Sequence, residues 1–109
     1  MPNIDDMTLG ELKKLSSLFA KNTETNYEPG QKYFIRTVTM HHVGELVSVN
    51  DRELKLKNAS WVADSGRFYT ALKTGNLNEV EPFLDEVIIP RDSVIDATIW
   101  RHSLPVSQK

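Results

Sequence analysis

The stretch from residue 33 to residue 63 is dominated by β-branched and aromatic side chains, and it constrains the fold more than any other part of the chain. Such residues are enriched in strands because their side chains pack well on a pleated, half-buried surface. Tyr33–Val43 therefore predicts one long strand. Gly44 follows it and predicts a bend, because a glycine inside an extended segment often marks a bend or a close approach of two backbones.

The second half of this stretch predicts a hairpin. Residues 45–49 continue extended, and Asn50–Glu53 is rich in turn-forming residues. Leu54–Lys57 then alternates apolar with charged side chains, which places both leucines toward a core and both lysines in solvent. The third extended run continues to Ala63 and stops at the turn residues 64–66.

Two apolar runs near the end of the chain predict the last strands. Val87–Ile89 and Val94–Trp100 are rich in β-branched residues, and the four residues between them favour a tight turn. Residues 76–86 carry four acidic and no basic side chains, so we expect a solvated connection there. An edge strand is expected around Val80–Phe83, since its proline argues against a central position in a sheet.

A helix is predicted ahead of the strands. Thr8 and Glu11 fit a capping box, in which the two side chains satisfy free backbone donors at a helix start. Leucines recur at helical spacing after this box, so the helix is predicted over about residues 8–20, with one face covering a core.

A second, shorter helix is expected inside the β framework. Asp64 or Ser65 can cap a helix within Arg67–Lys73, and Gly75 can end it.

Together, these elements predict a single domain over residues 1–109. Its parts are an N-terminal helix at about 8–20, a barrel at about 31–101, an insertion at about 64–86 and a flexible tail at 102–109.

The composition excludes several classes of protein. The 109 residues include 13 basic and 15 acidic side chains, a net charge of −2, whereas proteins that hold long nucleic acids usually carry a basic excess. The chain has no cysteine, which excludes disulfides, thiolate metal sites and cysteine nucleophiles. No signal-peptide pattern and no run of about 18 apolar residues is present, so we expect a cytoplasmic protein without a membrane partner.

The order of these elements resembles the Sm-like barrel, a strongly bent five-stranded small barrel preceded by a helix. Val43–Asp51 with Leu54–Asn58 looks like the first Sm signature, and Val87–Ile95 looks like the second. The resemblance covers residues 9–58 and 87–100. It implies a mainly β fold, a five-stranded Sm-like or SH3-like small barrel with an N-terminal helix and a short inserted helix. Small barrels leave open strand edges, so a homo-oligomer is expected.

The chain also departs from this family. Sm-like proteins that bind RNA usually have an Asp and an Asn two positions apart in the loop after the second strand, and an Arg-Gly or Lys-His pair in the last turn. Here Asp51 is followed by Arg52 and Glu53, and Arg91 is followed by Asp92. The RNA site is therefore not carried over by identity.

The candidate ligand-binding residues gather around the predicted inserted helix. Arg67, Phe68 and Tyr69 follow a glycine turn at its start, where free amides and the helix dipole favour an anion. With Trp61 and Asp64 nearby, they predict a pocket that stacks a base, pairs a phosphate with Arg67 and accepts a hydrogen bond at Asp64. The alternative is that Phe68 and Trp61 belong to the core, that Asp64 is a cap and that Arg67 is solvated.

Other arginines extend this hypothesis. Arg91 in the last turn joins the ligand-binding set, and Arg36 and Arg101 offer further planar forks of donors that match phosphate. Each of these arginines alone is better explained as a surface residue, so the hypothesis depends on whether they converge in space.

Metal binding and catalysis have weaker support. His41 and His42 are adjacent in a predicted strand, so they point to opposite faces and do not easily share one ion. The sequence contains no nucleophile elbow, zinc motif or phosphate loop. We therefore expect no metal, no cofactor and no enzymatic activity.

Three functions stay open from the sequence. The leading expectation is non-enzymatic binding or sequestration of a small nucleotide-type ligand by a homo-oligomeric small barrel. Small size, a neutral-to-acidic surface and the lack of catalytic motifs also suit compact phage counter-defence proteins that sequester immune-signalling nucleotides. The alternatives are an Sm-like ring that binds single-stranded RNA, and a structural or adaptor module without a ligand.

Overall fold

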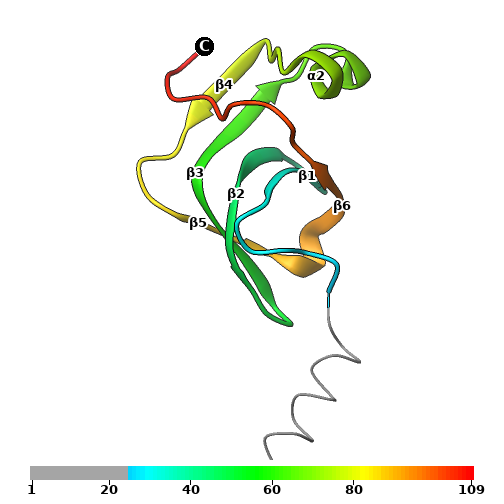
Figure 1. Cartoon of the computed structure of the whole chain (residues 1–109), viewed down its shortest axis with the longest axis vertical. Coiled ribbons are helices and arrows are strands. Elements are labelled where there is room, and N and C mark those ends of the chain that lie inside the picture. Colours follow the sequence, from blue (N-terminus) through cyan, green and yellow to red (C-terminus); the bar gives the residue numbers. More distant parts are fainter. Residues whose placement is uncertain (1–24) are drawn as a thin grey trace, which may run out of the picture.

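The computed structural model describes residues 25–109, which form an antiparallel six-stranded sheet with one α-helix (Figure 1). The mainly β expectation is thus confirmed, while the N-terminal helix predicted over residues 8–20 lies outside the described residues. The elements are, in chain order, β1 (Lys32–Thr37), β2 (His41–Val49), β3 (Glu53–Asp64), α2 (Phe68–Thr74), β4 (Glu79–Pro82), β5 (Val87–Pro90), a 3-10 turn η2 (Arg91–Ser93) and β6 (Val94–Ile99).

The long strand β3 organises the sheet. The strand order is β4-β3-β2-β1-β6, and β5 also pairs with β3. β2 runs along one edge of β3, while the other edge is divided, since β5 pairs with Glu53–Leu56 and β4 pairs with Ser60–Asp64. Neither β4 nor β5 pairs with β6 in the described part of the chain, so the expected five-stranded small barrel is wrong. The sheet has six strands and stays open.

The sheet curls at β-bulges, and one of them lies at Gly44. Val43 pairs with Ser60 and Glu45 pairs with Lys57, so two residues of β3 oppose the single residue Gly44. A Cβ on this glycine would lie 2.8 Å from the Cβ of Ala59, closer than real Cβ atoms approach. The bend expected at Gly44 therefore coincides with a bulge that needs a residue without a side chain.

The single long strand predicted over Tyr33–Val43 is wrong, because β1 ends at Thr37 and β2 begins at His41. The side chain of Thr37 closes the turn between them. Its hydroxyl accepts a hydrogen bond from the Met40 N–H (3.0 Å) and contacts the Met40 carbonyl at 2.8 Å as donor. No glycine or proline marks this turn, so the β-branched composition concealed it.

The two faces of the sheet carry two separate hydrophobic clusters. The inner cluster lies inside the curl and consists of Tyr33, Ile35, Leu46, Leu54, Leu56, Ala59 and Ile89. The helix-side cluster lies under α2 and the C-terminal residues and consists of Phe34, Val43, Val62, Ala71, Leu77, Val80 and Trp100. Consecutive residues of β1 thus point into different clusters, and β1 is buried on both faces.

The short predicted helix is confirmed as α2, which ends at Thr74, one residue beyond the predicted Arg67–Lys73, but its predicted cap is not confirmed. Arg67 is the N-cap residue and no side chain caps the helix. The Asp64 carboxylate instead accepts a hydrogen bond from the Gly66 N–H at 2.8 Å and so shapes the preceding turn. Gly75 ends the helix as predicted, in the left-handed conformation with φ of 80°.

The chain after β6 folds back onto α2 and β4. The His102 Nε2 lies 2.7 Å from the carbonyl oxygen of Leu72, and the Trp100 indole N–H donates to the Ser103 carbonyl. Lys109 and Val80 exchange two backbone hydrogen bonds of 3.0 and 3.1 Å. The tail that the sequence predicts to be flexible, residues 102–109, therefore lies along the outer edge of β4 in the structure.

Candidate functional site

The structure separates the six predicted ligand-binding residues into three places. Arg67, Phe68 and Tyr69 stand together at the start of α2. Trp61 and Asp64 belong to the last part of β3, and Arg91 begins η2 between β5 and β6. Figure 1 shows α2 and the β5–β6 connection at opposite ends of the sheet. One pocket formed by all six residues is therefore not present within a single chain.

One arginine from outside this set does reach the start of α2. The guanidinium carbon of Arg36, on β1, lies 4.8 Å from the centroid of the Phe68 ring. Phe68 itself packs edge-on against Phe34 at 5.5 Å between centroids, which fixes the ring beneath the guanidinium. We call Arg36, Arg67, Phe68, Tyr69 and Asp96 the α2 rim.

The charge of Arg36 is held in place by Asp96 of β6. The Arg36 Nε–H donates to Asp96 Oδ1 at 2.8 Å, and Arg36 Nη2 also pairs with Asp96 Oδ2. This bond raises the pKa of Arg36 and lowers the pKa of the Asp96 carboxyl. A guanidinium has five N–H donors and this two-point contact uses two of them, so the rest of the fork can bind an acceptor.

Two members of the α2 rim, Arg67 and Tyr69, are open to solvent. Tyr69 is 73% exposed. Arg67 is exposed, and in the part of the chain that the structure describes it pairs with no carboxylate. The α2 rim therefore combines the Arg36 guanidinium, which lies over the half-buried Phe68 ring, with the exposed side chains of Arg67 and Tyr69 at the start of the same helix.

The remaining predicted residues have other surroundings. Trp61 faces the opposite side of the sheet, because it pairs with His42 and is followed by Val62, whose side chain points into the helix-side cluster. Arg91 donates to the Asn50 carbonyl at 2.7 Å and lies 5.7 Å above the Tyr27 ring. Both contacts tie Arg91 to the β2–β3 turn and the inner-cluster side.

The histidines and serines do not assemble into a familiar catalytic or metal site. His41 lies against Phe34, whereas the ring of His42 stacks on Phe83, so the two histidines point to opposite faces as expected. Ser60 and His42 each have a buried atom without a hydrogen-bond partner, but they also lie on opposite faces. Within residues 25–109, no group of three or more metal-ligating side chains comes together.

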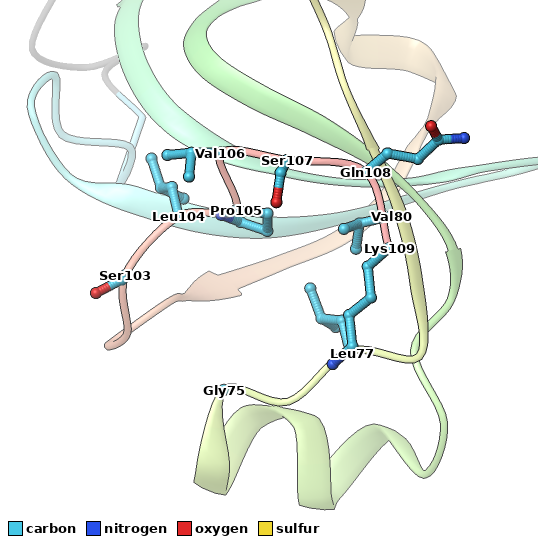
Figure 2. Close-up of a pocket in the computed structure, with 10 residues that line it drawn as sticks. All are labelled: Gly75, Leu77, Val80, Ser103, Leu104, Pro105, Val106, Ser107, Gln108 and Lys109. Carbon is cyan, nitrogen blue, oxygen red and sulfur yellow. The ribbon is translucent and has the colours of Figure 1, made fainter.

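A shallow cavity of about 370 Å³ lies between the C-terminal tail and β4 (Figure 2). Leu77 and Val80 form one side, and Leu104, Pro105 and Val106 of the tail arch over it. None of the predicted binding residues lines this cavity. The sequence offered no sign of it, because the tail reads as a polar, proline-containing end.

Comparisons of this chain with protein-family models, with curated proteins and with solved structures find no match. In the described part of the chain, no helix is long and apolar enough to cross a membrane.

Proposed function

We propose that this protein is a non-enzymatic binding module that holds a small nucleotide-type anion at the α2 rim and works as a homo-oligomer. One observation carries the proposal: the Arg36 guanidinium lies 4.8 Å over the ring of Phe68, which Arg67 and Tyr69 flank in the chain at the start of α2. A phosphate would pair with Arg67 and the unused donors of Arg36. The exposed Tyr69 ring would stack on the base. Sequestration of a signalling nucleotide is the role that such a site suits.

The rigidity of Arg36 supports this assignment. Asp96 and Phe68 already fix its guanidinium, so a ligand does not have to order a free arginine side chain when it binds. The Asp96 carboxylate offsets part of the charge of Arg36, so a ligand with a single acceptor oxygen gains little there. The site therefore suits one ligand with several acceptor oxygens better than scattered single phosphates of a long nucleic acid.

The open edges of the sheet support self-association. In the described residues, β5 pairs only with β3 and β6 pairs only with β1, so each has one unpaired edge. Ile88 on β5 is 53% exposed, and Ile95 and Ile99 on β6 are 63% and 41% exposed. Unpaired edges with exposed apolar side chains favour strand pairing between copies.

Native mass spectrometry of the purified chain tests both parts of the proposal together. We expect a closed oligomer that retains, or takes up from a panel of adenine and guanine nucleotides, a discrete nucleotide-sized mass. Ile88→Lys and Ile99→Lys should shift the oligomer toward monomer. Arg67→Ala should weaken nucleotide binding about tenfold or more, as expected for the loss of a charge-assisted contact.

Arg91→Ala is the matched control, because Arg91 is another solvent-accessible arginine but lies at the far end of the sheet. It should bind the same nucleotide as the unaltered protein does. Equal binding by the Arg67 and Arg91 variants would contradict the α2 rim as the site. A twelve-nucleotide RNA that binds more tightly than any nucleotide, with a steep loss of affinity in salt, would instead favour the RNA-binding alternative.

A further inference from the structure

A second group of aromatic side chains gathers on the face of the sheet opposite α2. His42 of β2 pairs with Trp61 of β3, and Trp61 pairs with Glu81 of β4, so these three side chains point to the same face. The Phe83 N–H donates to the Ala59 carbonyl, which brings Phe83 alongside β3. We call His42, Trp61 and Phe83 the aromatic cluster.

The small side chain of Ala59 allows this cluster to form. His42 and Phe83 belong to segments on either side of β3, yet their rings stack with centroids 5.9 Å apart and an angle of 17° between planes. A larger residue at position 59 would stand between them. Trp61 and Phe83 keep 37% and 39% of their surfaces exposed.

His42 is the polar member of the cluster, and one of its two ring nitrogens lacks a hydrogen-bond partner in the described part of the chain. Its side chain is 7% exposed, and its Nδ1 is buried without a hydrogen-bond partner in the described part of the chain. Buried polar atoms are nearly always paired, so an unpaired one within a surface cluster points to a group that completes the site.

The chain segment that carries Glu81 and Phe83 is acidic. Residues 74–90 contain four acidic side chains and no Lys, Arg or His. Glu81 faces Trp61 directly across the β3–β4 ladder, and Gln108 bonds to Oε1 of this carboxylate, which leaves Oε2 to bind another donor. Aromatic faces carry negative partial charge, so rings and carboxylates here attract a cation and repel phosphate.

We propose that the aromatic cluster binds the cationic side chain of an arginine or lysine on a basic segment of a protein partner. The cation lies over the Trp61 indole and pairs with the Glu81 carboxylate. The methylene stem lies along Phe83 and the neighbouring Leu84, which is fully exposed at 101%. This surface goes beyond the proposed anion site, since it has the opposite charge and lies on the other face of the sheet.

Fluorescence anisotropy with a labelled peptide of four Gly-Arg repeats tests the proposal on the full chain. We expect saturable binding, with a Gly-Glu peptide of equal length as the negative control. Trp61→Ala should weaken binding about tenfold, the loss expected for one desolvated cation–π contact, and Trp61→Phe should restore part of it. Glu81→Gln should weaken binding about threefold, because an exposed ion pair contributes less.

Two control variants keep the test specific. Ile95→Ala removes an exposed apolar residue on β6 and Arg67→Ala alters the α2 rim, so both should bind the arginine peptide as the unaltered protein does. If the unaltered protein binds a nucleotide but does not bind the arginine peptide, only this inference is overturned and the proposed anion site stands. The inference is overturned if no saturable peptide binding occurs or if Trp61→Ala and Phe83→Ala bind normally. It is also overturned if Trp61→Ala changes only the oligomer mass, because a second copy of the chain would then be the occupant.

Discussion

The inner cluster and the helix-side cluster share the strand β1 but are built in different ways. The inner cluster takes all of its fully buried members from strands, and these are mostly aliphatic residues at alternating positions. The helix-side cluster combines residues of β1, β2, β3 and β4 with α2, Leu77 and Trp100, and residues beyond β6 close over it. The first is a sheet curled on itself, and the second is a sheet face that needs a separate cover.

This difference has a consequence for local stability. A cluster made only of neighbouring strands persists as long as the ladder hydrogen bonds do. A cluster covered by a seven-residue helix and a tail depends on a few contacts between segments that carry little stability alone. We therefore expect the helix-side cluster to open first. Substitutions at its contacts should lower the free energy of unfolding, and they are given below from the largest expected effect to the smallest.

The largest effect is expected from Trp100→Ala. The indole is 1% exposed, packs on Phe34 at 5.9 Å and on His102 at 5.1 Å, and donates to the Ser103 carbonyl. Its removal should cost about 3–5 kcal/mol in the free energy of unfolding, measured by urea denaturation. Trp100→Phe keeps a ring but loses the N–H bond, so it should cost about 1–2 kcal/mol.

Hydrogen exchange on Trp100→Ala separates the two clusters directly. Amides of α2 and β4 should lose protection, while those in the first half of β3, opposite β5, should keep most of theirs. Uniform loss of protection across both regions would show that the two clusters unfold as one unit.

The two clusters also differ in how well the sequence predicts them. The alternation at Leu54 and Leu56 is enough by itself to predict that both leucines point inward, and both are fully buried in the inner cluster. The helix-side cluster brings Phe34 together with Phe68 and Trp100, residues distant in sequence whose meeting depends on the whole topology. Periodicity reports which residues share one face of a local segment, but not which remote segment covers that face.

The same limit explains the candidate site. Arg67, Phe68 and Tyr69 are neighbours in sequence, and the structure keeps them together at the start of α2. Arg36 contacts Phe68 only because the position of β1 in the sheet brings it under the helix. The same topology places Arg91 at the other end of the sheet, where it bonds to Asn50. Local motifs were therefore predictable, whereas the convergence of distant arginines was not.

The next effect is expected from Gly75→Ala, at the point where α2 meets the tail. This glycine has φ of 80°, and an added Cβ would lie 2.6 Å from the His102 Cγ. The variant combines a strained backbone with a clash, so its free energy of unfolding should be about 2–3 kcal/mol lower than that of the unaltered protein. Urea denaturation gives this difference.

Gly30→Ala is the matched control for the backbone term. Gly30 has φ of 91°, but nothing lies within 4 Å of the added Cβ. Gly30→Ala should lower the free energy of unfolding by about 1 kcal/mol, which is the strain of a left-handed residue alone. Equal losses at the two glycines would show that the packing of His102 against α2 contributes nothing to the helix-side cluster.

A gain in stability is expected from Ser60→Ala. The Ser60 hydroxyl is completely buried at the edge of the helix-side cluster and has no hydrogen-bond partner in the described part of the chain. Removing an unsatisfied buried hydroxyl should stabilise the protein by about 1 kcal/mol in urea denaturation. Thr37→Val is the opposing control, because the Thr37 hydroxyl is bonded to Met40, and it should destabilise by a similar amount.

The smallest effect is expected from His42 of the aromatic cluster, which makes the free energy of unfolding depend on pH. Burial, with a smaller contribution from His41, lowers the pKa of His42 below its ordinary value of 6.5. The unfolded chain therefore binds a proton at this residue more readily than the folded chain does. The contribution of His42 to stability is complete above about pH 6.5, the ordinary pKa, and is lost as the pH falls from there toward the folded pKa.

His42→Phe should remove this dependence while keeping the stack on Phe83. We expect the free energy of unfolding to fall between about pH 7.5 and about pH 5.5 more in the unaltered protein than in His42→Phe. His41→Phe should retain most of the dependence, because burial is the larger cause of the lowered His42 pKa. An equal fall in the unaltered protein and in His42→Phe would contradict the assignment, and the acid sensitivity would then belong to groups outside the aromatic cluster.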